Sequence, residues 1–124
     1  MSSDPPTSHP RPATAVDVQV RTLAPDRRLV TVRGQLDLHT AHGLADALEP
    51  LLGRNDQAVL VDLSGVTFLD STGLTCLITA YRTARATGAR LALIAPSRPV
   101  RTMLQLTGVD QVLDTYPSPE AAPH

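Results

Sequence analysis

Two short apolar runs constrain the fold of this 124-residue chain more than any other feature. Residues 58–63 read AVLVDL and residues 91–95 read LALIA, which is typical of strands covered on both faces of a parallel sheet. The segment between them, 72–87, carries apolar side chains at helical spacing and is followed by Gly88. A strand, a helix and a strand in this order predict two parallel neighbours joined by a right-handed crossover.

The flanking segments extend this pattern on both sides. Alternating valines from Val16 and the run 29–34, separated by a Pro-Asp turn, predict an antiparallel hairpin. Helices are predicted over 40–52 and 97–108, and a short last strand over 111–115. The order is ββαβαβαβ. It predicts one α/β domain with a mixed sheet of about four or five strands, parallel in the middle, with helices packed against it.

The two ends of the chain differ in composition from the middle. Residues 1–15 contain four prolines among Ser, Thr and His, and we predict a disordered N-terminal tail. Residues 16–115 form the predicted domain. Residues 116–124 are again rich in proline and predict a short, unstructured C-terminal tail.

Composition excludes several classes of function. The net charge is −1 with no basic or acidic block, so we expect neither direct nucleic-acid binding nor membrane binding. All eleven basic residues are arginine, and the missing lysine excludes P-loop, protein-kinase and Schiff-base chemistry. The single cysteine, Cys76, lies in a predicted helix and indicates a structural thiol. With no apolar leader or membrane span, a cytoplasmic protein is expected.

Ser71 is the most informative candidate site residue. Residues 65–74 read GVTFLDSTGL and place this serine between a predicted strand and a predicted helix. Such a hydroxyl can cap the helix, together with Asp70 and Thr72. It can also accept a phosphate, because backbone N–H groups and the helix dipole stabilise negative charge there. The local sequence alone leaves both interpretations open.

Two motifs resemble one known family. Residues 34–37, GQLD, are similar to the G-E-L-D turn of the STAS family, and residues 61–74, VDLSGVTFLDSTGL, resemble its central signature. Within that family the chain is most similar to bacterial anti-sigma-factor antagonists. The resemblance spans residues 16–115, and Gln35 departs from it by replacing the usual Glu.

The resemblance implies a mechanism. An unmodified antagonist binds an anti-sigma factor that is also a Ser kinase, and so frees a sigma factor. The kinase phosphorylates the serine after the signature Asp, which matches Ser71, and a Ser/Thr phosphatase reverses the modification. ATP belongs to the partner, so no cofactor is expected. The implied partner surface comprises Asp37, Asp70, Ser71, Thr72 and Gly73.

Each of these residues also has a structural interpretation. Asp37 lines the partner surface or acts as a turn or cap residue. Thr72 is a second possible phosphoacceptor, although capping is favoured. Gly73 permits close approach by a partner or by the neighbouring loop. His39 and His42 lack the further ligands that a metal site needs, and none is predicted.

Two other functions remain as alternatives to the switch. An enzyme is disfavoured, because Ser71 lacks the first glycine of G-x-S-x-G and no histidine is placed as its base. A STAS domain that is not phosphorylated also serves as a scaffold in a sensory complex or as a small subunit of a lipid or anion transport system. A monomer or weak dimer is expected.

Overall fold

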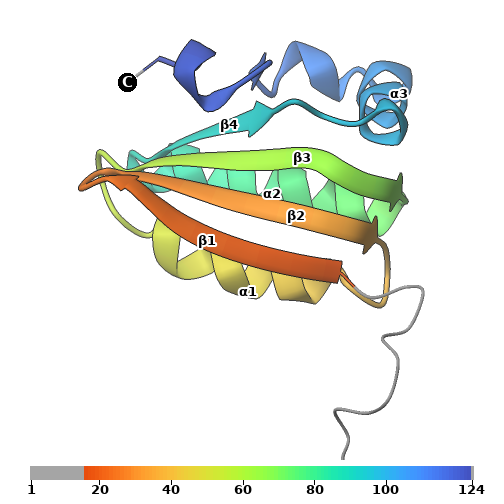
Figure 1. Cartoon of the computed structure of the whole chain (residues 1–124), viewed down its shortest axis with the longest axis horizontal. Helices are drawn as coiled ribbons and strands as arrows, with labels where there is room; N and C mark the ends of the chain where they lie inside the picture. Colours follow the sequence, from red (N-terminus) through yellow and green to blue (C-terminus); the bar gives the residue numbers. More distant parts are fainter. Residues whose placement is uncertain (1–15, 124) are drawn as a thin grey trace, which may run out of the picture.

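One five-stranded sheet organises the chain (Figure 1), and the computed structural model describes residues 16–123. The sheet order is β1-β2-β3-β4-β5; β1 pairs antiparallel with β2, and every later pair is parallel. This mixed α/β sheet confirms the predicted fold class. The strands are β1 (Val16–Ala24), β2 (Arg27–Leu36), β3 (Ala58–Leu69), β4 (Arg90–Ile94) and β5 (Thr115–Tyr116).

Three helices complete the predicted order: α1 (Ala41–Leu52), α2 (Ser71–Thr87) and α3 (Arg98–Thr107). α1 and α2 lie side by side behind the sheet (Figure 1). The predicted stops Gly88 and Gly108 are confirmed, because each ends its helix in the left-handed conformation, at φ of 82° and 76°.

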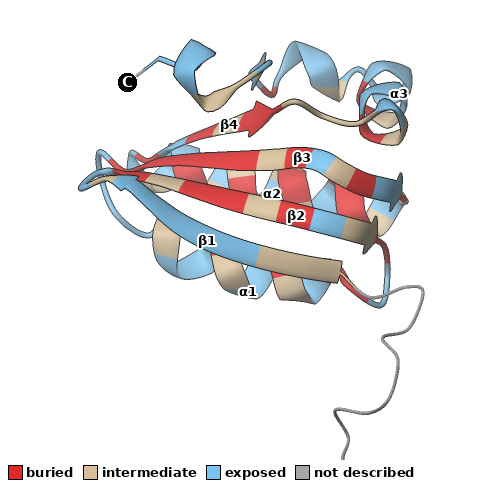
Figure 2. Cartoon of the chain, in the orientation of Figure 1, coloured by how far each residue is buried: buried red, intermediate tan, exposed pale blue. Residues whose placement is uncertain are grey.

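The main core lies between the sheet and the helices and is built almost entirely from Leu, Val and Ala. Alternate residues of β3 show how the apolar runs are used. Val59 and Val61 pack in the helix-side core, whereas Leu60 lies in a second, smaller cluster. Burial of both sets explains why this strand is an unbroken apolar run. Figure 2 shows that burial concentrates in β2, β3 and β4, while the edge strand β1 is largely exposed.

The last strand does not lie where the sequence predicted it. We predicted a strand over 111–115, but Val109–Gln111 form a short 3₁₀ helix and only Thr115–Tyr116 pair with β4. The N–H groups of Val112 and Leu113 both donate to the Val109 carbonyl oxygen, at 2.9 and 3.0 Å. Those bonds hold the segment in a turn. At the end of this turn the Leu113 side chain is buried in the main core.

The C-terminal segment is folded rather than an unstructured tail. Pro119–Ala121 form a second 3₁₀ helix, and Ala122 packs into the smaller core cluster with 3% of its surface exposed. Arg27 holds this segment against the sheet. Its Nη2 donates to the carbonyl oxygens of Pro119 (2.8 Å) and Ala122 (3.0 Å). The tail predicted over residues 1–15 lies outside the described residues.

Replacing Arg27 with alanine is expected to lower the free energy of unfolding by about 2 kcal/mol, since two carbonyl oxygens lose a charged donor at a buried site. Amide exchange in 118–122 should accelerate more than exchange in the helix-side core. Urea denaturation and hydrogen exchange measure both effects. Arg21→Ala, at an exposed position of β1, is the matched control and should change stability by less than about 0.5 kcal/mol. Equal effects of the two substitutions would contradict a clamping role for Arg27.

Candidate functional site

The candidate site forms where β2 and β3 end side by side. Leu36 and Leu69 are register partners at the carboxyl ends of these parallel strands. The next residues, Asp37 and Asp70, therefore begin two adjacent connections. One is the loop 37–40 before α1, and the other leads directly into α2. The register thus places the ends of the two sequence motifs side by side.

Asp70 caps α2 and ties the two connections to each other. It is the N-cap residue, and its Oδ1 accepts from the Gly73 N–H at 3.0 Å. Its other oxygen, Oδ2, accepts from the Leu38 N–H at 3.2 Å. One carboxylate therefore satisfies a helix N–H group and fixes the neighbouring loop.

Ser71 is the first residue of α2, and its side chain is exposed. Its carbonyl oxygen accepts from Thr75 Oγ1 at 2.8 Å. Among residues 16–123, its hydroxyl has no hydrogen-bond partner. The N-cap residue is Asp70 rather than Ser71, and the Ser71 hydroxyl is left accessible in the first turn of the helix.

Asp37 performs the turn role that was one of its two predicted interpretations. Only 8% of its surface is exposed. Its Oδ1 accepts from the His39 N–H (2.9 Å) and lies 3.1 Å from Thr40 Oγ1. Its carbonyl oxygen accepts from the N–H groups of Thr40 and Ala41. The side chain thus shapes the loop 37–40 from within.

Gly73 lets α2 approach the end of β2 closely. A Cβ at this position would collide with the Leu36 carbonyl oxygen and would lie 2.7 Å from Leu69 Cδ1. The close approach predicted from the sequence is therefore made by the chain's own strand end. Thr72 is half-buried and borders the groove between α1 and α2.

Comparison with known proteins identifies the family. Residues 15–122 match the STAS domain family. The chain belongs to this family. The match ends at 122 rather than 115, in keeping with the folded C-terminal segment of this STAS domain.

Curated relatives and solved structures of STAS domains show what the chain is similar to. An anti-sigma-B factor antagonist of Listeria monocytogenes is 24% identical over 99 residues, which is 80% of this chain and 87% of that protein. The anti-sigma-F factor antagonist RsfB of Mycobacterium tuberculosis is 29% identical over 71% of each chain. The crystal structure of an anti-sigma factor antagonist from Mycobacterium paratuberculosis superimposes with a TM-score of 0.74 at 28% identity, covering 85% of this chain and 88% of that one.

Two large apolar side chains near Ser71 were not predicted as site residues. Leu38, held by Asp70, is 68% exposed, and Phe68 at the end of β3 is 47% exposed. Exposed apolar side chains beside a candidate contact residue are typical of docking surfaces. The sequence did contain a signal for Leu38, because it is an apolar residue between the polar residues Asp37 and His39.

The remaining polar candidates of this STAS domain are His39, His42 and Cys76. His39 and His42 are both exposed, and within 16–123 no group of three or more metal-binding side chains is found. Cys76 is half-buried with its Sγ 3.6 Å from the Ala41 carbonyl oxygen, and burial raises the pKa of its thiol. No helix of the described chain is long and apolar enough to span a membrane.

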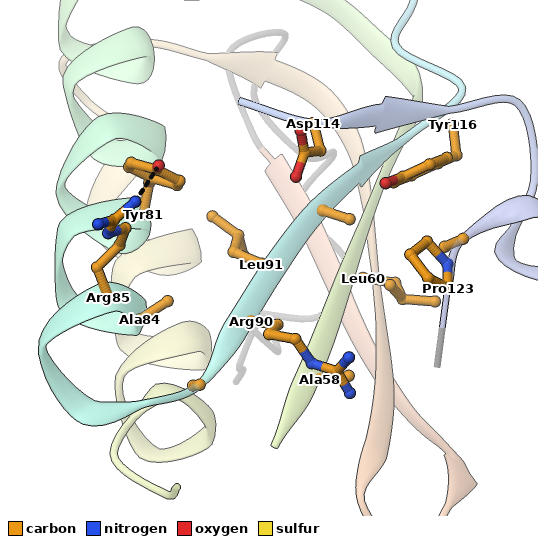
Figure 3. A pocket seen from close by; sticks show the side chains of 13 residues that line it. Ala58, Leu60, Tyr81, Ala84, Arg85, Arg90, Leu91, Asp114, Tyr116 and Pro123 are labelled. Carbon is orange, nitrogen blue, oxygen red and sulfur yellow. Dashed lines mark hydrogen bonds between the residues drawn. The ribbon is translucent and has the colours of Figure 1, made fainter. Parts of the chain in front are cut away.

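A cavity of about 230 Å³ lies away from Ser71 (Figure 3). It is lined by the first residues of β3 and β4, by α2 and by the C-terminal segment, so it lies toward the other end of the parallel strands. Arg85 stacks over the Tyr81 ring there and donates to its hydroxyl at 3.2 Å. None of the predicted site residues lines this cavity.

Proposed function

We propose that this STAS domain is an anti-sigma factor antagonist whose binding is switched off by phosphorylation of Ser71. The observation that carries the proposal is an exposed hydroxyl without a partner at the first residue of a helix that Asp70 already caps. The names of the curated relatives support the same role.

The proposed switch is local. A phosphate on Ser71 brings up to about two negative charges to a surface that already carries the Asp70 carboxylate. The helix dipole of α2 offsets part of that charge within the domain. Docking on a partner would remove the compensating water, so the repulsion appears mainly in the complex. The fold is retained while the affinity falls.

The five residues of the proposed partner surface divide into two groups. Asp70, Ser71 and Thr72 contact the partner at the start of α2. Asp37 and Gly73 are positioning residues, since one shapes the loop 37–40 and the other seats α2 against β2.

The proposed partners follow from this switch. The anti-sigma factor is a Ser kinase that supplies its own ATP, and a Ser/Thr phosphatase resets the antagonist. The domain binds no cofactor, performs no catalysis and acts as a monomer or weak dimer. It acts in the cytoplasm, where sigma factors meet RNA polymerase. The relatives' names support this role rather than a scaffold or transport subunit.

Phosphorylation mapping tests the proposal. The kinase-like anti-sigma factors of the source genome are purified and incubated with the full chain and Mg-ATP, and the phosphate is located by mass spectrometry. We expect phosphate on Ser71 of the wild type, none on Ser71→Ala, and unchanged labelling of Thr72→Ala. Thr75→Ala, four residues along the same helix, is the matched control and should be labelled like the wild type.

Binding in the same assay separates a switch from a scaffold. Ser71→Ala should bind the anti-sigma factor as the unmodified wild type does. Phosphate on Thr72 in place of Ser71 would move the switch to the second hydroxyl. Absence of both binding and phosphate with every anti-sigma factor would overturn the antagonist role.

A further inference from the structure

An open groove of about 400 Å³ lies beside the Ser71 surface, between the end of β3 and α3. Both elements lie at the same side of the view in Figure 1. We call it the α3 groove; its lining residues are Phe68, Leu69, Arg98, Pro99, Thr102, Met103 and Leu106.

The α3 groove exposes apolar surface that the fold does not use. Leu106 is 79% exposed and Phe68 is 47% exposed. The main core takes Val100 and Leu104 from α3, and Met103 packs against that core while also lining the groove. Large apolar side chains gathered around a groove are typical of a site for another molecule.

The groove is formed before any partner arrives. Ser97, the N-cap residue of α3, donates its hydroxyl to the Val66 carbonyl oxygen at 2.6 Å. Its N–H donates to the Leu63 carbonyl oxygen at 3.2 Å. These two bonds fix the start of α3 to β3, so both walls are held in place and little ordering is needed on binding.

The charge at the groove indicates what it receives. Arg98 is the charged residue of the lining, and Arg101 follows one turn later, exposed. The first turn of α3 contains no acidic residue. Arg101 donates from its Nη1 to the Pro96 carbonyl oxygen at 3.0 Å and so is engaged at the start of α3. A cation at a helix N-terminus opposes the helix dipole, so the charge of Arg98 does not serve the stability of α3. The charge of Arg98 suits an acidic side chain on the molecule that enters the groove.

We propose that the α3 groove docks an apolar segment of the anti-sigma factor that carries an acidic side chain beside Arg98. The inference rests on the proposed function. The groove continues the surface around Ser71, since Phe68 in its lining lies three residues before Ser71. Docking here would hold the anti-sigma factor while its kinase site reaches the Ser71 hydroxyl. The groove would thus raise affinity without taking part in phosphoryl transfer.

Binding and phosphorylation kinetics of full-chain variants show whether the groove acts in docking or in phosphoryl transfer. Leu106→Asp and Arg98→Glu are compared with Val112→Asp, which places the same charge on another exposed apolar residue outside the groove. The probe is the anti-sigma factor that phosphorylates Ser71. We expect its Kd to rise about tenfold or more for both groove variants and less than about twofold for Val112→Asp. The KM for Ser71 phosphorylation should rise in parallel while kcat stays unchanged, and Arg98→Lys should restore most of the affinity.

Other outcomes would overturn the inference without touching the proposed function. If the wild type binds and is phosphorylated but both groove variants bind equally well, the α3 groove is not the docking site. If light scattering shows a dimer that Leu106→Asp abolishes, the occupant is a second copy of this chain. If NMR contacts join residues 1–15 to the Leu106 methyl groups, the occupant is the chain's own N-terminal segment. A fall in kcat alone would assign the groove to phosphoryl transfer instead.

Discussion

Replacing Gly73 with alanine is expected to lower the free energy of unfolding by about 3 kcal/mol, because the added methyl group has no room. Its nearest neighbours would be the Leu36 carbonyl oxygen and the Leu69 side chain. The first of these is a backbone atom at the end of β2 and cannot rotate away. The helix-propensity gain of up to about 1 kcal/mol only partly offsets the clash. Thermal unfolding should shift down by roughly 10–20 °C.

The same substitution should damage the site. α2 must move away from β2 to admit the methyl group, and Asp70 moves with its first turn. The bond from the Leu38 N–H to Asp70 Oδ2 would then lengthen, and the loop 37–40 would lose its link to α2. We therefore expect weaker binding of the anti-sigma factor even at temperatures where the variant is fully folded.

Gly43→Ala is the matched control for Gly73→Ala. Gly43 also lies near the start of a helix, α1, but a Cβ there meets only Val16 Cγ1 at an ordinary 3.6 Å. This substitution should be neutral or stabilising by up to about 1 kcal/mol. Urea denaturation of both variants makes the comparison. Equal stabilities would show that the start of α2 moves freely enough to admit a methyl group, and would contradict close packing of Gly73 against the end of β2.

The sequence predicts the fold well wherever apolar spacing decides the structure. The continuous runs at 58–63 and 91–95 become central parallel strands, because both of their faces are covered. The predicted strand covered residues 58–63, with Ser64 and Gly65 outside it. The strand instead runs to Leu69 and absorbs these residues through two register shifts against β2. Irregular pairing of this kind depends on the neighbouring strand and leaves no local signal.

The prediction for the C-terminal segment was wrong for a different reason. Its prolines suggested an unstructured tail, but Arg27 lies far away in the sequence and supplies the bonds that hold it. Side-chain contacts over such a separation have no pattern in a single sequence. Burial of Ala122 likewise depends on Leu29, Leu60 and Ile94, which come together only in the folded sheet.

The candidate site shows the same division. Ser71 and Asp70 are predicted because a polar pair between a strand and a helix must lie at an accessible helix start. Which of the two caps the helix depends on backbone geometry, and the structure assigns that role to Asp70. The exposure of Leu38 follows from its bond to Asp70, a contact between two motifs that are distant in the sequence.

Phosphorylation of Ser71 is expected to weaken binding of the anti-sigma factor by about 100-fold while leaving the domain folded. The phosphate would lie at the start of α2, close to the Asp70 carboxylate that accepts from the Gly73 N–H. In the free domain, water and the helix dipole stabilise the added charge, so unfolding free energy should change by less than about 1 kcal/mol. In the complex the same charge loses its water beside Asp70 and meets a surface that fits a neutral hydroxyl.

Titration calorimetry with the phosphorylated and unmodified full chain measures this difference, and scanning calorimetry measures stability. The Kd ratio should shrink as salt is raised from 0.1 to 0.5 M, since salt screens repulsion between partly exposed charges. Ser71→Ala is the uncharged control and should bind within about threefold of the wild type. Ser71→Asp should fall between Ser71→Ala and the phosphorylated chain, because one carboxylate carries less charge than a phosphate. A ratio that does not respond to salt, together with weak binding by Ser71→Ala, would mean that the partner recognises the hydroxyl itself and that charge repulsion does not operate the switch.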